Sequence, residues 1–222
     1  ILRNVHVIAF VGPNGIQITR KQQDDEHHFF EQRGESDMDL TREHALSTLE
    51  TYTKTEALRK HAFAVEGVMR YFAREAGEDE NYWGIVGLLH DVDYEQWPEE
   101  HLKVAPRLLE EAGYDAAFIH AVLAHGWGLC SDVKPEKRME TVLYTIDELT
   151  GLITAAAYMR PSRSVMDMEV SSVKKKFKDK GFAAGVSREV ILGGCELLGI
   201  PLEDVIQKSI LGMRDVHEAL GM

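Results

Sequence analysis

Hydrophobic residues recur at spacings of three and four along almost the whole chain from about residue 39 onward, and nothing there alternates convincingly like a β-strand. This spacing places apolar side chains on one face of a helix. Glycine follows several periodic segments, as helix C′ positions favour, and Pro98 opens one of them, where its missing N–H costs nothing. The pattern predicts an all-α fold with helices near residues 41–51, 54–76, 79–90, 98–112, 115–125, 135–159, 168–179, 187–198 and 202–219.

The first 37 residues follow a different pattern. Two short apolar segments, residues 5–11 and 16–20, flank the sequence Gly-Pro-Asn-Gly, which is typical of a β-hairpin. The loop is not a phosphate-binding P-loop, because Gln17 and Ile18 stand where that motif needs glycine and lysine. We therefore expect residues 1–37 to be a dispensable N-terminal extension, either native or the result of a mis-assigned translation start, and residues 38–222 to be the domain.

The 222-residue chain is 44% hydrophobic, enough for one sizeable core, and its formal net charge at pH 7 is −12. Nucleic-acid polymers and anionic membranes attract basic proteins, so we expect neither as a partner. Cys130 and Cys195 form no CxxC motif, and no apolar run approaches the ~20 residues that span a bilayer. These features favour a reducing, cytoplasmic setting. They do not indicate the oligomeric state.

Ligand-type side chains stand on the inner side of two expected helices. His61 shares an apolar face with Leu58 and Val65, so its ring points inward, either toward a metal or as a core histidine bonded to a carbonyl. His90 and Asp91 stand where the next helix ends. Adjacent residues on a helix point about 100° apart, so both can reach one ion only at such an end. The helix dipole favours histidine there but disfavours aspartate, whose charge a cation would compensate.

A third helix carries Asp147 beside an apolar stripe that includes Leu143 and Ile146. An inward carboxylate is unfavourable unless it is paired or metal-bound. A half-exposed acid on the edge of the stripe is the alternative. Imidazole and carboxylate ligands together suit Mn, Fe, Zn, Co or Ni, and a carboxylate-rich site also holds Mg. We predict that one divalent ion is bound by His61, His90, Asp91 and Asp147.

The ordered set H…HD…D on a helical scaffold resembles the HD superfamily of metal-dependent phosphohydrolases. The segments GLLHDVDYE, HLKVAPRLLEEAGY, AVLAHG and IDELTGLITAA are similar to a bacterial subgroup close to the HDIG proteins, and the likeness covers roughly residues 39–222. The resemblance implies an HD-domain-like helical bundle that holds one or two divalent metal ions.

The resemblance also implies ligands for a second ion, because two-metal members of the family use histidines at the places of His101 and His125. Asp91 is then the natural bridge between two ions. His125 shares its expected face with Phe118, which points it inward, whereas His120 is offset and is expected at the surface or behind the ligands. A histidine on the helix surface is the alternative for His101, and a partner of the helix dipole is the alternative for His125.

The chain departs from the HDIG pattern after the HD pair, where Asp93 and Tyr94 replace the family's Gly-Lys. The lysine that would meet a phosphate there is missing. Asp93 and Glu95 are candidates for protonating a leaving group or positioning the attacking water. An ordinary acidic loop is the alternative.

Basic residues gather between residues 160 and 180 of this otherwise acidic chain. They form either a solvated helix face or a rim that attracts a phosphorylated anion. Arg160 is the best candidate for a phosphate contact, because arginine binds phosphate through two parallel hydrogen bonds and this one stands at the end of the Asp147 helix. Lys174 and Lys178 are the further candidates for substrate binding.

The leading hypothesis is a metal-dependent phosphohydrolase, a phosphomonoesterase or phosphodiesterase, that acts on a small phosphorylated molecule or nucleotide. HD proteins with the full ligand set also include di-iron oxygenases, and a non-enzymatic nucleotide-sensing helical module is a third hypothesis. The sequence does not separate the first two, because they share the same metal ligands.

Overall fold

The structure is a computed structural model of the chain, and it describes residues 8–12, 15–19 and 38–222. The chain divides into two compact units, Ile1–Met38 and Asp39–Met222. In the first unit, strand β1 (Ile8–Gly12) pairs antiparallel with strand β2 (Gly15–Thr19), as the hairpin pattern predicted. The other residues of the expected extension lie outside the described residues, and its dispensability stays a prediction.

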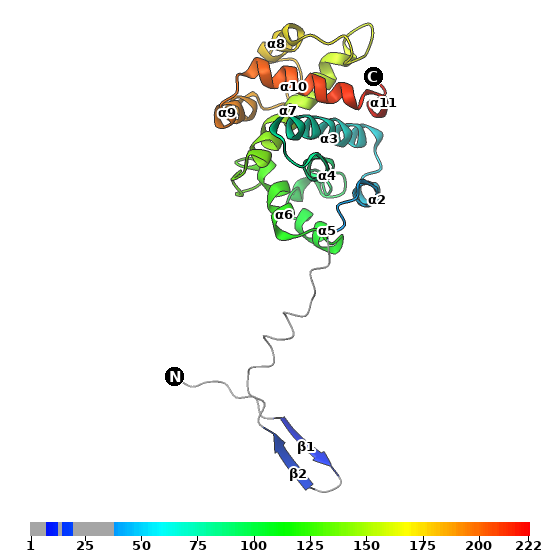
Figure 1. Ribbon diagram of the computed structural model, residues 1–222, viewed down its shortest axis with the longest axis vertical. Helices are drawn as coiled ribbons and strands as arrows, with labels where there is room; N and C mark the ends of the chain where they lie inside the picture. The colour runs from blue at the N-terminus through cyan, green and yellow to red at the C-terminus, as the bar shows by residue number, and fades with distance from the viewer. Residues whose placement is uncertain (1–7, 13–14, 20–37) are drawn as a thin grey trace. The chain divides into compact units, whose positions relative to one another are not determined.

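The second unit is helical, which confirms the all-α prediction (Figure 1). Short 3-10 turns cover Pro98–Glu100 and Ala124–Gly126. The α-helices are α2 (Arg42–Tyr52), α3 (Glu56–Ala76), α4 (Glu80–Leu89), α5 (Ala105–Glu111), α6 (Ala116–Leu123), α7 (Arg138–Tyr158), α8 (Val170–Lys178), α9 (Arg188–Leu198), α10 (Leu202–Asp215) and α11 (His217–Leu220). Among the residues described, no helix is long and apolar enough to cross a membrane.

Polar side chains at the helix starts explain several of these boundaries. Thr41, Asp79, Asp115 and Ser187 precede α2, α4, α6 and α9, and each accepts a hydrogen bond from a backbone N–H of the first turn. Such caps satisfy donors that have no partner inside the helix, and each contributes typically about 1 kcal/mol. The sequence therefore marks these helix starts locally, before any packing between helices.

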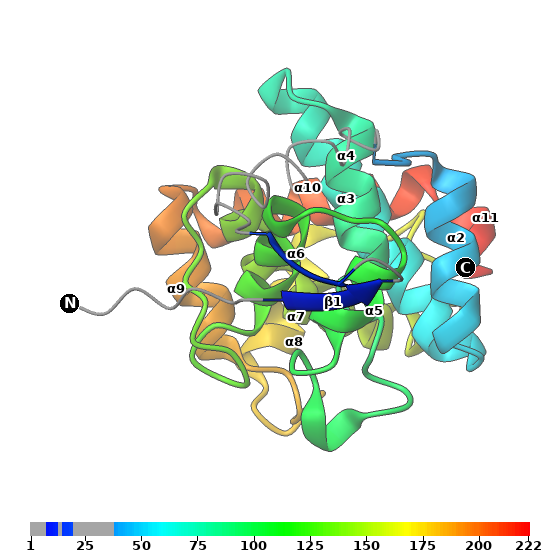
Figure 2. The same ribbon diagram turned by 90° about the horizontal axis from the view of Figure 1, so that it is seen from below.

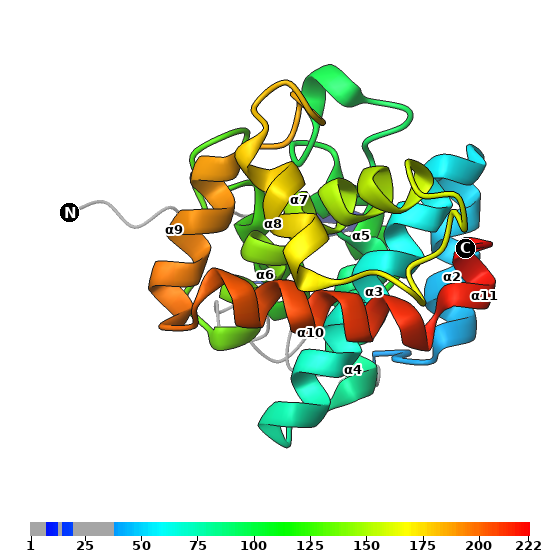
Figure 3. The ribbon, with the colours of Figure 1, turned by 90° about the horizontal axis from the view of Figure 1, so that it is seen from above.

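Helix α3 lies at the centre of the unit, where it packs against α4, α7 and α10 (Figures 1 and 2). Its buried side includes Val65, Val68 and Phe72, as the periodicity predicted. Close approach to α10 depends on two glycines, since a Cβ atom on Gly67 would stand 2.6 Å from the carbonyl oxygen of Gly212. Figure 3 looks onto α8, α9 and α10, which pack against α7 on its other side. Helices α3 and α7 thus meet in the core, where α3 also contacts α4, and α7 also contacts α8 and α9.

The expected helix at 98–112 is wrong in its first half. After the 3-10 turn at Pro98, the chain leaves helical geometry at His101 and Leu102, and α5 begins only at Ala105. Leu102 has a φ of 64°, in the left-handed region that interrupts a helix. The carboxylate of Asp93 stabilises this break, because it accepts hydrogen bonds from the backbone N–H groups of Leu102 and Ala105. A similar break at Val216 divides the segment expected as one helix at 202–219 into α10 and α11.

Candidate metal centre

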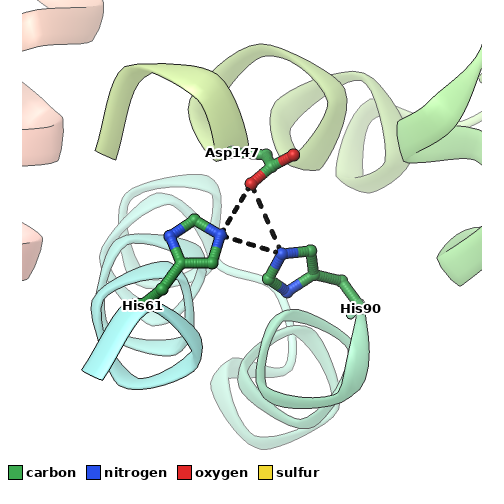
Figure 4. Close-up of side chains that lie close together, drawn as sticks. All are labelled: His61, His90 and Asp147. Carbon is green, nitrogen blue, oxygen red and sulfur yellow. Dashed lines mark hydrogen bonds and ion pairs between the residues drawn. The ribbon is translucent and has the colours of Figure 1, made fainter. Parts of the chain in front are cut away.

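Three helices bring a histidine, a second histidine and an aspartate together (Figure 4). His61 comes from α3, His90 follows the last residue of α4, and Asp147 comes from α7. His61 Nε2 lies 2.9 Å from Asp147 Oδ1 and 3.2 Å from His90 Nε2, and His90 Nε2 lies 3.3 Å from Asp147 Oδ1. Figure 4 shows that the two imidazole nitrogens and one carboxylate oxygen point at the same small volume. This convergence is the arrangement that a metal ion needs.

Asp91 lies between this group and two further histidines. Its Oδ2 is 3.3 Å from His90 Nε2 and 3.8 Å from His61 Nε2. Its Oδ1 is 3.4 Å from both His101 Nε2 and His125 Nε2. The two oxygens of one carboxylate therefore face two different pairs of histidines, and the structure brings together all the residues that the sequence predicted as metal ligands.

The histidines at the ends of α4 and α6 are oriented by the backbone of their own helices. His90 Nδ1 donates to the carbonyl oxygen of Gly87 at 2.7 Å, and His125 Nδ1 donates to that of Val122 at 2.6 Å. A proton on Nδ1 leaves the lone pair of a neutral ring on Nε2, the atom that faces the cluster. Metal-bound histidines usually have a hydrogen-bond partner of this kind. Both rings are thus already oriented with Nε2 toward the cluster, as a metal would require.

His101 is oriented by Asp93 in the same way. The ring donates through Nδ1 to Asp93 Oδ1 at 2.8 Å, while Asp93 Oδ2 accepts from the N–H groups of Leu102 and Ala105 at 2.8 and 2.9 Å. Asp93 is fully buried. Both of its oxygens are engaged, so the carboxylate holds a histidine in place and is not free for the proton transfer suggested by the sequence.

Glu95 is also engaged elsewhere. Its carboxylate accepts hydrogen bonds from the backbone N–H groups of Lys54 and Thr55 and from the Thr55 hydroxyl, at 2.7 to 3.0 Å. Those groups precede the first turn of α3, so Glu95 caps that helix from a distant part of the chain. The arrangement fits the alternative of a structural acidic loop better than a catalytic role.

The charges in the cluster shift the ionisation of its members. Burial opposes ionisation of Asp91 and Asp147, but the nearby histidines outweigh burial and hold the pKa of both carboxyl groups below the usual range. Burial alone would lower the pKa of His90, yet Asp91 and Asp147 outweigh it and raise the pKa well above 6.5. The carboxylates therefore favour a positive charge at their centre, which either protonated rings or a bound cation can supply.

The cluster opens into a cleft of about 360 Å³. Apart from the predicted ligands, its wall is formed by Leu58, Tyr94, Gly126, Leu129, Cys130, Glu148, Gly151, Gly185, Val186 and Val190. Among the described residues, neither lysine nor arginine contributes to this wall. Positive charge to match an anionic ligand would therefore have to come from the centre itself.

The basic residues that the sequence proposed for substrate binding do not line the cleft. Arg160 Nη2 lies 2.9 Å from Asp167 Oδ2, and Lys174 is paired with Glu203. Lys178 is the last residue of α8 and is exposed. This arrangement corresponds to the alternative of a solvated helix face. His120 likewise stays outside the ligand cluster, with Nδ1 3.2 Å from Glu140 Oε1.

The wall also includes residues to which the sequence assigned no role in the site, among them Tyr94, Glu148 and Gly151. Tyr94 places its ring edge-on to His101, with ring centroids 5.2 Å apart. Glu148 accepts a hydrogen bond from the Ser187 N–H, and burial together with the adjacent Asp147 raises the pKa of its carboxyl group. Gly151 follows Asp147 by four residues in α7. That last spacing is a usable signal, because residues four apart lie on the same face of a helix.

The donor set fits a divalent metal. Two groups, His61–His90–Asp147 and His90–Asp91–His125, each have ligand atoms within 4.8 Å of one another. Imidazole and carboxylate donors at buried and half-buried positions, with rings fixed by hydrogen bonds, are typical of transition-metal sites. Fold and site together define an all-α protein with a candidate metal centre of histidine and aspartate.

Comparison with protein families agrees with this description. Residues 58–165 match the family model of the HD domain, and this part of the chain belongs to the HD-domain superfamily. HD domains bind divalent metals and are generally metal-dependent hydrolases. The likeness to the HDIG subgroup is not confirmed by this match. Comparisons with curated proteins and with solved structures gave no match.

Proposed function

We propose that this chain is a metal-dependent phosphohydrolase that releases phosphate from a small phosphorylated molecule. The observation that carries the proposal is the position of Asp91, whose two carboxylate oxygens face separate pairs of histidines. Such a carboxylate suits a bridge between two cations. Within a superfamily of metal-dependent hydrolases, a paired-cation centre at the floor of an open cleft favours phosphoester chemistry.

The proposal assigns each ligand to one of two ions. His61, His90, Asp91 and Asp147 would hold the first. His101 and His125 would hold the second, with Asp91 shared. Divalent ions at such positions activate water as a nucleophile and neutralise phosphoryl charge.

The remaining residues of the site prepare it for this chemistry. The carbonyls of Gly87 and Val122 and the carboxylate of Asp93 keep three rings in one tautomer, so no side chain has to reorient during turnover. Leu58, Val186 and Val190 give the cleft apolar walls. Such walls exclude water and strengthen the electrostatic interactions of a bound anion.

Phosphate binding should depend on metal to an unusual degree. Because no described lysine or arginine lines the cleft, the ionisable groups that a phosphate would meet there in the metal-free protein are mainly carboxylates and histidines. We propose a small monoester or nucleotide as the ligand, and neither a nucleic-acid polymer nor a membrane surface, because the chain carries a net charge of −12.

The test combines metal analysis with a substrate panel. Freshly purified protein should contain one to two equivalents of divalent metal. Phosphate release from monoesters or diesters should stop with chelator and return with Mn, Co or Mg. Asp147→Ala should lose metal and activity together. Asp215→Ala is a matched control, because this aspartate of α10 pairs with Arg74 of α3 and lies outside the cleft.

Other outcomes would redirect the assignment. Bound iron, with oxygen consumption and no phosphate release from any ester, would replace the hydrolase by a di-iron oxygenase. Nucleotide binding without turnover under any metal would indicate a sensing module.

A further inference from the structure

A second cavity, of about 150 Å³, adjoins the metal cleft. The two cavities share His61 and Gly151 in their walls, so they meet beside the candidate centre. The second cavity follows one face of α7, along which Gly151, Thr154 and Tyr158 succeed Asp147 at helical spacing. Gly151 and His61 therefore stand between a ligand held at the centre and this space.

Packing does not explain the glycine at position 151. It lies in the interior of α7, where glycine is less favourable than alanine. A Cβ atom built on Gly151 would find its nearest neighbour, Val186 Cγ2, at 3.9 Å, which is ordinary van der Waals contact. On Gly194 of α9, by contrast, a Cβ atom would stand 2.1 Å from the Thr145 hydroxyl oxygen. Gly194 is required by helix packing, whereas no packing contact requires Gly151, which lines both cavities.

The walls of the second cavity indicate the chemistry of its occupant. Besides the two shared residues they comprise Ala57, Lys60, Thr154, Tyr158, Leu220 and Met222, so carbon surface predominates. The charge of Lys60 is already matched, since its Nζ lies 2.7 Å from Glu56 Oε1. An uncharged, mainly apolar group fits this environment, and a second phosphate or carboxylate does not.

We propose that Gly151 keeps a passage open and that the substrate is a phosphate monoester whose uncharged, mainly apolar organic group extends past Gly151 into the second cavity. This inference rests on the proposed phosphohydrolase function, because it places the phosphate at the candidate centre. It assigns Gly151 as a residue that determines substrate size and makes no catalytic contact.

The test measures binding to the metal-loaded full chain by calorimetry, with two non-hydrolysable probes, methylphosphonate and hexylphosphonate. Each methylene that leaves water on binding strengthens affinity by roughly threefold to fourfold when fully buried. The wild-type chain should therefore bind hexylphosphonate at least about tenfold more tightly than methylphosphonate. Gly151→Ala, and more strongly Gly151→Leu, should reduce this preference, chiefly by weakening the binding of hexylphosphonate.

Gly193→Ala is the matched control. Gly193 also lies inside a helix, α9, with no atom within 4 Å of a built Cβ, but it lines neither cavity. Thermal unfolding should show both alanine variants to be at least as stable as the wild type, because each replaces a helix glycine. Gly193→Ala should retain the full preference for hexylphosphonate.

Three results would overturn the passage. They are equal affinity of the wild type for the two probes, binding of neither probe, and an undiminished preference in both Gly151 variants. Turnover of methyl and hexyl phosphate is measured separately. A preference for the longer probe that Gly151→Ala abolishes, without release of phosphate from any ester, would support the passage and refute the hydrolase. Release of phosphate from both esters at equal kcat/KM, with no preference in binding, would support the hydrolase and refute the passage.

Discussion

His101 donates a hydrogen bond through Nδ1 to Asp93 at 2.8 Å, and the same carboxylate holds the backbone that carries His101. Asp93 stands where the HDIG proteins have the glycine of Gly-Lys, and in this chain it supports a candidate ligand. A buried carboxylate with three hydrogen-bond donors around it is a positioning group, and its effect on chemistry would pass through the ring of His101.

Asp93→Asn should reduce metal affinity while the fold survives. The amide oxygen is expected to accept from Leu102 and Ala105, which turns the NH₂ group toward His101 Nδ1. That ring must then carry its proton on Nε2, which removes the lone pair that faces Asp91. Loss of such a supporting partner typically weakens metal binding by about 10- to 100-fold. Competition with a metal-sensitive dye measures the change.

Two comparisons decide whether this explanation holds. Circular dichroism of the variant should remain helical. His101→Ala combined with Asp93→Asn should be no worse in metal affinity than His101→Ala alone, because the two act through one ring. Additive losses in the double variant would contradict a positioning role.

Glu95→Ala should destabilise the protein and leave metal content unchanged. The carboxylate caps α3 through the N–H groups of Lys54 and Thr55, so its removal should lower the Tm by a few degrees. Hydrogen bonds from Thr55 lower the pKa of Glu95 from its ordinary value of 4.5. A group with a lowered folded-state pKa stabilises above its unfolded-state pKa, and this stabilisation is lost as the pH falls through the lower value.

The Tm difference between wild type and Glu95→Ala should therefore be constant above about pH 5 and shrink below the ordinary carboxyl pKa. Differential scanning calorimetry across that range measures it. A large fall in kcat at neutral pH, with unchanged Tm, would restore the catalytic role that the sequence suggested for Glu95.

The gain in stability on metal binding should grow from pH 6 to pH 8. In the metal-free protein the pKa of His90 is raised, so its protonation stabilises the fold below pH 6.5 and this contribution is lost as the pH rises through the higher folded-state value. Protons also compete with metal for the rings, which weakens binding at low pH. Both effects make the gain in stability on metal binding larger at higher pH. The Tm with and without saturating Mn measures the gain, and a gain that decreases toward pH 8 would contradict a histidine-rich centre.

A chain that starts at Met38 should fold with a Tm close to that of the full chain. The described helices form a unit from Asp39 to Met222, and the composition changes at the same place. Metal content should also be unchanged. A Tm lower by many degrees would show that the first 37 residues contribute to the stability of the helical domain.

Local patterns were sufficient to predict most of the helices and part of the residues that meet at the candidate centre. His61 stands in a run of apolar residues at helical spacing, and His90-Asp91 stands at an unfavourable place for an aspartate, so each position could be interpreted without knowing its neighbours. The resemblance to HD proteins supplied His101 and His125. In these cases the signal lies within a few residues of the ligand itself.

The predictions for Glu95 and Lys174 concern side chains whose partners lie far away in the sequence. Nothing near Glu95 indicates that it reaches Lys54 and Thr55 some 40 residues earlier. The basic run around Lys174 was predicted to bind substrate because the rest of the chain is acidic, but Lys174 pairs with Glu203 of α10. Periodicity shows which side of a helix is apolar, but it does not show which other segment lies opposite.

The hydrogen bonds from His90 to Gly87 and from His125 to Val122 have a further effect on how the centre forms. The last carbonyls of a helix have no partner within it, and here two rings supply the missing donors. The same hydrogen bond therefore ends the helix and orients its candidate ligand, and it forms as soon as the helix forms. Metal uptake then has little side-chain entropy left to remove, so binding should be fast and limited by the loss of water and protons. Ring-selective NMR relaxation in the metal-free state would reveal this pre-formed order.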